Sequence, residues 1–289
     1  MAEAAQHTDR HSASAGAGFG ARLAEAMSSL GPLCVGVDPH PGLLEAWGLE
    51  DSATGLREFS SRVLEASTGR VAAIKPQVAL YERHGSAGLA ALETLLAEAA
   101  AAGVLTIADA KRGDIGSTMA AYADAWLSPS SPLAADAVTL SPYLGFESLR
   151  PALDLAAAHG RGVFVLALTS NPEGASVQHV GAEASVARRI VEAAAAENAG
   201  AAGLGSVGLV VGATVGQAIS DLGIDLAALN GPILAPGLGA QGATAEDMRR
   251  TFGAAYPLVL GTSSRDILKD GPSAEGLVTA IGRTLAGLR

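Results

Sequence analysis

Charged residues close the apolar run Val104-Leu105-Thr106-Ile107-Ala108-Asp109-Ala110-Lys111-Arg112-Gly113-Asp114. A short apolar run that stops at charges and a glycine is typical of a buried strand leading into a loop. Asp109 and Lys111 are two residues apart, so in an extended strand both side chains point to the same side. The stretch therefore predicts a strand that delivers a carboxylate and an ammonium group to one end of a sheet.

Similar apolar runs recur along the chain at fairly regular intervals. The eight runs are Leu33–Asp38, Val71–Pro76, Leu105–Ala110, Ala137–Pro142, Gly162–Ser170, Val207–Ala213, Pro232–Gly237 and Pro257–Ser263. Between them lie stretches with apolar residues at three- and four-residue spacing, such as Ala87–Ala102, Ser185–Asn198 and Ala243–Phe252. Strands that alternate with amphipathic helices are typical of parallel βαβ units.

Eight such units in about 250 residues match a single-domain α/β protein of the (β/α)8 TIM barrel type. The main rival is a doubly wound open sheet, which usually carries a glycine fingerprint after its first strand. The first run instead ends in Gly36-Val37-Asp38-Pro39-His40-Pro41. We expect residues 1–18 to form a disordered polar tail and residues 19–289 to form the barrel.

Composition excludes several classes of partner. The 289 residues carry a formal net charge of -10, which argues against nucleic acid or an anionic membrane surface as the main partner. No apolar run approaches the roughly 20 residues that span a bilayer, and the first residues lack the apolar core of a secretion signal. The single cysteine, Cys34, favours a reducing compartment. These features predict a cytoplasmic protein.

Lysine is rare in this chain and concentrated at strand ends. It occurs only at positions 75, 111 and 269, while arginine supplies the other sixteen positive charges. Unlike arginine, lysine has a compact ammonium group that can give up its proton. In barrels, the catalytic groups lie where strands end, so Lys75 and Lys111 could alternate there with the carboxylates of Asp109 and Asp114. A simple ion pair at the barrel mouth is the alternative, worth roughly 0–1 kcal/mol.

The pattern Asp109-x-Lys111-x-x-Asp114-Ile115-x-x-Thr118 resembles the signature of the orotidine 5′-phosphate decarboxylase family. The supporting motifs are Val35-Gly36-Val37-Asp38, Ile74-Lys75-Pro76, Thr169-Ser170-Asn171-Pro172-Glu173-Gly174, Pro236-Gly237-Leu238-Gly239-Ala240-Gln241-Gly242 and Gly261-Thr262-Ser263-Ser264-Arg265-Asp266. The Ser-Asn-Pro-Glu-Gly loop is similar to that of a bacterial subgroup with longer chains. The matches run from the first predicted strand to the eighth.

This resemblance implies a decarboxylation of orotidine 5′-monophosphate that uses no cofactor and no metal. Lys111 would protonate C6 of the pyrimidine, Asp109 would face the substrate carboxylate, and Lys75 would hold Asp109 and the ribose hydroxyls. Asp38 would accept a hydrogen bond from a ribose hydroxyl. The family also implies a homodimer with shared active sites, in which Asp114, Ile115 and Thr118 belong to the site of the neighbouring subunit.

The same resemblance implies a phosphate site after the last two strands and a base-reading loop after the fifth. Gly237 and Gly239, beside Pro236, allow backbone N–H groups to approach an anion, and Gln241 would close over it. Arg265, beside Ser264, offers a planar fork for phosphate oxygens. Either Thr169 or Ser170 would read the pyrimidine amide, and we favour Ser170.

Two alternatives remain open at this point. A related sugar-phosphate lyase or aldolase on the same barrel would need a divalent metal or a Schiff base on Lys75 or Lys111. A catalytically silent nucleotide-binding barrel would need no buried proton donor, so the complete set of charged strand-end residues argues against it.

Overall fold

The computed structural model describes residues 17–239 and 243–288 of the chain, and its centre is a closed barrel of eight parallel strands in sequence order. The strands are β1 (Leu33–Val37), β2 (Ala73–Pro76), β3 (Leu105–Arg112), β4 (Ala137–Leu140), β5 (Gly162–Leu168), β6 (Val207–Val211), β7 (Ile233–Pro236) and β8 (Val259–Ser263). β1 pairs with both β2 and β8, which closes the ring. All eight predicted strands and the predicted TIM barrel are confirmed.

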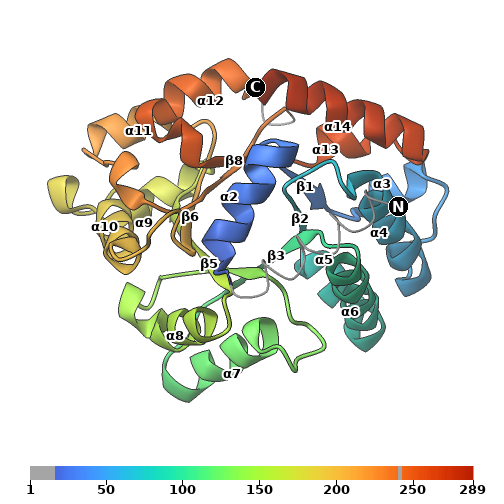
Figure 1. Ribbon diagram of the computed structural model, residues 1–289, viewed down its shortest axis with the longest axis horizontal. Coiled ribbons are helices and arrows are strands. Elements are labelled where there is room, and N and C mark those ends of the chain that lie inside the picture. Colours follow the sequence, from blue (N-terminus) through green and yellow to red (C-terminus); the bar gives the residue numbers. More distant parts are fainter. Residues whose placement is uncertain (1–16, 240–242, 289) are drawn as a thin grey trace, which may run out of the picture.

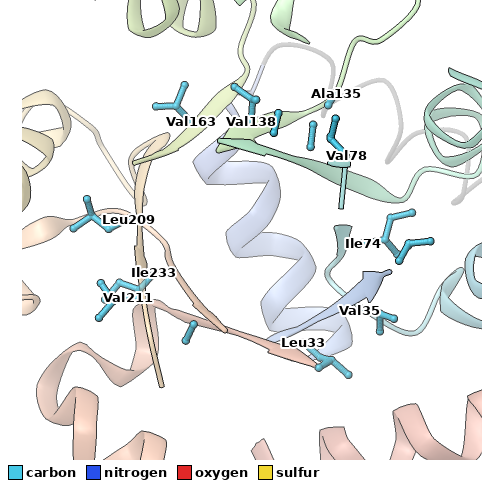
Figure 2. Close-up of a cluster of buried hydrophobic side chains, with 14 of the residues drawn as sticks. Leu33, Val35, Ile74, Val78, Ala135, Val138, Val163, Leu209, Val211 and Ile233 are labelled. Carbon is cyan, nitrogen blue, oxygen red and sulfur yellow. The ribbon is translucent and has the colours of Figure 1, made fainter. Parts of the chain in front are cut away.

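Helices surround the barrel because alternate strand residues point outward and are apolar (Figure 1). The longer ones are α4 (Ala53–Ser67), α6 (Gly85–Ala101), α7 (Gly116–Leu127), α8 (Arg150–Ala158), α10 (Val186–Asn198), α12 (Ala245–Phe252) and α14 (Ala274–Leu288). The short ones are α3 (Pro41–Ala46), α5 (Ala79–Glu82), α9 (Ala175–Gln178), α11 (Gly216–Asp221) and α13 (Arg265–Leu268). Figure 2 shows Val35, Ile74, Val138 and Leu209 around the outside of the ring, where they form the main core.

Helix α2 (Phe19–Leu30) covers the N-terminal end of the barrel (Figure 1). Its Phe19 meets Phe164 of β5 edge to face, with ring centroids 5.9 Å apart, a geometry worth about 0.5–1.5 kcal/mol beyond area burial. Arg22 of the same helix binds Asp136 at 2.7 Å. The barrel is therefore filled and closed at this end, whereas the charged strand residues Lys75 and Asp109 lie toward the other.

Two further expectations concern the N-terminal tail and membrane-spanning helices. The proposed tail falls almost wholly on residues 1–16, outside the described part of the chain, and α2 begins at Phe19. Within the described residues, the structure contains no helix that is both long and apolar enough to cross a membrane.

Candidate active site

The charged centre of the barrel mouth is the carboxylate of Asp109, at the end of β3. Nζ of Lys75, from the neighbouring β2, lies 2.8 Å from Asp109 Oδ2, and Nζ of Lys111 lies 2.5 Å from Asp109 Oδ1. The structure therefore brings together the three charged groups that the sequence predicts at the ends of two adjacent strands.

Two uncharged side chains complete the hydrogen bonding of this carboxylate. The Thr139 hydroxyl, from β4, donates to Asp109 Oδ1 at 3.0 Å, and the Gln77 amide donates to Oδ2 at 3.1 Å. Each carboxylate oxygen thus accepts two hydrogen bonds, which fills the acceptor capacity of an ionised carboxylate. Neither Thr139 nor Gln77 is predicted from the sequence to contact Asp109, because their approach to it depends on the register between neighbouring strands.

Charge pairing governs the protonation of the buried pair. Burial of Asp109 acts to raise its pKa, but Lys75 and Lys111 more than offset burial and hold that pKa well below its usual range. Burial of Lys75 likewise acts to lower its pKa, but Asp109 and Asp38 raise it above the ordinary lysine value. At neutral pH the Asp109 carboxylate is therefore ionised and the Lys75 amine is protonated.

The backbone at Lys111 corrects one expectation. Lys111 is not extended: its φ is +49°, in the left-handed region that residues other than glycine rarely adopt. The pairing between β3 and β4 shifts register between Ala108 and Arg112, which marks a bulge in β3. Such bulges re-aim a side chain. Asp109 and Lys111 still meet, but through a bulged turn of the chain rather than the simple alternation of a strand.

Asp38 and Ser264 form a polar corner where β1 and β8 end. Among the described residues, Asp38 Oδ1 and Ser264 Oγ are buried atoms with no hydrogen-bond partner. Gly36 makes the corner possible, because a Cβ at that position would lie 2.7 Å from the Ser264 Cβ and 3.1 Å from Asp38 Oδ2. Buried polar atoms of this kind are normally satisfied, so the corner can accept a polar ligand group.

The loops after β7 and β8 lie next to each other, as a shared anion site requires. Gly237 and Gly239 both have positive φ, +113° and +78°. A Cβ on Gly239 would lie 2.9 Å from the Asp266 side chain, next to Arg265. Arg265 is exposed at the start of α13 and makes no salt bridge among the described residues. The predicted loop residue Gln241 lies outside the described part of the chain, and Pro236 ends β7.

The loop after β5 contains both candidate base-reading residues, Thr169 and Ser170. The Thr169 hydroxyl donates to Asn171 Oδ1 at 2.6 Å and accepts a hydrogen bond from Gln178 Nε2 at 2.7 Å. The Gln178 amide oxygen also accepts the Thr169 N–H at 2.9 Å. Thr169 therefore shapes its own loop, while Ser170 is exposed at the strand end. The contribution of Gln178 could not be read from the sequence, because it depends on how the loop folds back.

Asp114 and Ile115 lie in the loop after β3, and Thr118 lies at the start of α7. Asp114 Oδ1 accepts the Ile115 N–H at 2.8 Å, and the described contacts include no ion pair between Asp114 and either lysine. Ile115 is 62% exposed, and Thr118 is exposed on the first turns of α7. Among the described residues, the ion-paired centre therefore consists of one carboxylate and two ammonium groups, and Asp38 is a further negative charge that acts on Lys75.

No group of three or more His, Cys, Asp or Glu side chains within the described residues is arranged to hold a metal ion. Cys34 is buried in β1, and this burial raises the pKa of its thiol to about 12.

Known proteins resemble this chain over most of its length. The profile of the "Orotidine 5'-phosphate decarboxylase / HUMPS family" matches residues 31–274. The chain is 57% identical over 273 residues to the orotidine 5′-phosphate decarboxylase of Salinispora tropica, covering 94% of this chain and 97% of that protein. Identity to the Streptomyces coelicolor enzyme of the same name is 56% over 274 residues, covering 94% and 97%.

Solved structures show the same likeness. A crystal structure of a Streptomyces avermitilis protein, provisionally named as the same decarboxylase, superposes with a TM-score of 0.90 at 55% identity and covers 94% of this chain and 95% of that one. The Leishmania donovani OMP decarboxylase superposes with a TM-score of 0.74 at 29% identity, covering 94% and 97%.

Proposed function

This chain belongs to the orotidine 5′-phosphate decarboxylase / HUMPS family, and we infer that it is a carboxy-lyase that converts orotidine 5′-monophosphate to uridine 5′-monophosphate and carbon dioxide. This reaction belongs to pyrimidine biosynthesis. The observation that carries the assignment is identity of 56–57% to named decarboxylases across nearly the whole chain. The ion pairs of Asp109 with Lys75 and Lys111 support it.

In the proposed chemical step, the bond between C6 and the carboxylate carbon breaks and leaves its electron pair on C6. Carbon dioxide departs, and a proton passes from Nζ of Lys111 to C6. Lys111 is left neutral and regains a proton from water at the mouth, where its side chain is 45% exposed. A positioned ammonium group also stabilises the negative charge that develops at C6 in the transition state. Every proton and electron pair in this step is therefore supplied by the substrate, the protein or water.

Asp109 and Lys75 provide the fixed charges that surround the reacting groups during that step. Asp109 stays ionised because two ammonium groups and two neutral donors bind it, so it faces the substrate carboxylate as a fixed negative charge. Lys75 pairs with Asp109 and is buried next to it, which keeps the carboxylate in place.

The remaining mouth residues would bind the nucleotide. The buried corner of Asp38 and Ser264 suits the ribose hydroxyls. Arg265, with the backbone of Gly237 and Gly239 and with Gln241, suits the phosphate. Barrels often bind phosphate between the loops after their seventh and eighth strands. Ser170, with Thr169 shaping its loop, would read the pyrimidine.

We further propose a homodimer with shared active sites. Support comes from large apolar side chains exposed on one side of the mouth: Ile115 at 62%, Tyr143 at 79% and Leu144 at 55%. An exposed apolar patch beside polar residues is typical of a protein interface. In this dimer, Asp114, Ile115 and Thr118 reach the partner's nucleotide. A cytoplasmic location fits a chain whose single cysteine is buried.

Turnover of orotidine 5′-monophosphate in the presence of a chelator tests the function directly. We expect full activity. Turnover is measured as the decrease in absorbance when orotidine 5′-monophosphate becomes uridine 5′-monophosphate. Activity that disappears with chelator, or a Schiff base trapped by borohydride on Lys75 or Lys111, would favour a sugar-phosphate lyase or aldolase. Tight nucleotide binding without turnover would favour a silent binding barrel.

A further inference from the structure

A single threonine of β4 faces the bulged end of β3. Ala108 pairs with Val138 and Arg112 pairs with Leu140, so Thr139 stands alone opposite the three residues 109–111. The bulge disrupts the backbone ladder there. The Lys111 N–H instead donates to the Thr139 hydroxyl at 2.9 Å. This bond holds a residue whose left-handed backbone costs on the order of 1–3 kcal/mol and persists only where its surroundings fix it.

The same hydroxyl also binds the catalytic carboxylate. Its proton points to Asp109 Oδ1 at 3.0 Å, since the Lys111 N–H occupies the oxygen as a donor and an ionised carboxylate can only accept. Thr139 is 1% exposed, and a β-branched side chain has few χ1 choices. One rigid oxygen thus links the backbone of the proton donor to the side chain beside it.

We propose that Thr139 is a positioning residue for the decarboxylation, acting through Lys111 and Asp109 without contacting the substrate; this inference rests on the function proposed above. Loss of the hydroxyl releases the Lys111 amide and one of the four bonds to Asp109. The ammonium group of Lys111 then moves relative to C6. A misplacement of about 1 Å can slow a reaction about 100-fold. Nucleotide binding relies on other residues, such as Asp38 and Arg265. Removal of the Thr139 hydroxyl should therefore lower kcat and leave KM nearly unchanged.

The chain offers a matched control at the opposite end of the barrel. The Thr106 hydroxyl, near the start of β3, accepts the Asp136 N–H at 3.2 Å and donates to Asp136 Oδ2 at 3.2 Å. Thr106 is 3% exposed. It thus makes the same pair of bonds, to a backbone amide and to a carboxylate, far from the mouth. Thr106→Val measures what a buried threonine hydroxyl contributes to folding alone.

The test compares Thr139→Val, Thr139→Ser and Thr106→Val by steady-state kinetics with orotidine 5′-monophosphate and by thermal unfolding. We expect Thr139→Val to lower kcat roughly 10- to 100-fold with KM within about twofold. Thr139→Ser keeps the hydroxyl and should recover most of kcat. Thr106→Val should lower the melting temperature by a similar amount but leave kcat unchanged. If Thr139→Val does not fold, Thr139→Cys replaces it, because a thiol is a weak donor and acceptor.

Two results would overturn the inference: wild-type kcat in Thr139→Val, or a serine variant as slow as the valine variant. A crystal structure of Thr139→Val gives a readout independent of turnover. Lys111 should leave the left-handed region or lose its contact with Asp109, and an unchanged Lys111 would count against the proposal. If the wild-type protein itself does not turn over the nucleotide, the proposed function fails, and the structure of the variant still decides whether Thr139 positions Lys111.

Discussion

Nζ of Lys111 lies 2.5 Å from Oδ1 of Asp109, yet the Lys111 side chain is 45% exposed and that of Asp109 only 9%. The two members of this ion pair therefore have different access to water. The lysine can exchange its proton with solvent at the mouth after each turnover. The aspartate is enclosed by its four donors and keeps its charge throughout.

Replacement of Lys111 tests its assignment as proton donor. Lys111→Ala should abolish decarboxylation while leaving the affinity for uridine 5′-monophosphate largely intact. Lys111→Arg is the matched variant, because it keeps the positive charge but holds its proton too tightly to transfer it. Both variants should be inactive in a turnover assay and should bind product by calorimetry. More than a few per cent of wild-type turnover in either would disprove the role.

Arg265→Ala should weaken binding of phosphorylated nucleotides and leave unphosphorylated nucleosides unaffected. A charge-assisted contact to phosphate contributes about 1.5–3 kcal/mol, so Kd should rise roughly 10- to 150-fold. Arg283→Ala is the control, since Arg283 pairs with Asp270 on the helical layer at 2.8 Å. Calorimetric titration with uridine 5′-monophosphate and with uridine separates the two cases. Equal losses for both ligands would place Arg265 outside the phosphate site.

The charged centre also predicts how stability depends on pH. The pKa of Asp109 is lowered by folding, so its stabilisation is complete above about pH 4 and is lost as the pH falls toward the folded-state pKa. The pKa of Lys75 is raised, so its contribution is complete below about pH 10 and is lost above it. Asp109→Asn should therefore cost about 3–5 kcal/mol near neutral pH, where it leaves buried ammonium charge unpaired.

Melting temperatures of the wild-type protein and Asp109→Asn, measured from pH 3 to pH 9, check this prediction. The difference between the two should be constant above about pH 5 and should shrink toward pH 3. Asp154→Asn is a suitable control, because Asp154 is exposed and lies 3.7 Å from Arg150. A difference that widened as the pH fell would contradict the ionised state of Asp109.

Subunit mixing tests whether Asp114 acts in the partner's site. Lys111→Ala and Asp114→Ala subunits should each be inactive as pure dimers. After random exchange of equal amounts, half of the dimers are mixed, and each mixed dimer holds one site with both lesions and one with neither. About a quarter of wild-type sites should therefore reappear in an isologous dimer. If thorough exchange restored no turnover, Asp114 would act within its own chain.

The barrel and its charged residues could be predicted from the sequence because both depend on local patterns. Eight apolar runs with helical stretches between them specify the strands, and the charge after a run marks the strand end, as at Lys75 and Asp109. These signals need no knowledge of which strand lies beside which.

The contacts between strands could not be predicted in the same way. Thr139 and Gln77 reach Asp109 only because of the register of β4 and β2 against β3, and no periodicity in a single strand contains that register. The bulge at Lys111 is similar: the sequence there reads as an ordinary strand end, and the left-handed backbone arises from the pairing with β4.

Helix α2, which covers the N-terminal end of the barrel, limits the routes by which the products can leave. Phe19 and the inward-facing apolar residues fill the barrel beneath the charged centre, so carbon dioxide formed at the mouth has no route through the barrel axis. The gas and the nucleotide product must both leave by the opening through which the substrate entered. Substrate entry and the departure of both products therefore share the end of the barrel at which Lys75, Asp109 and Lys111 lie.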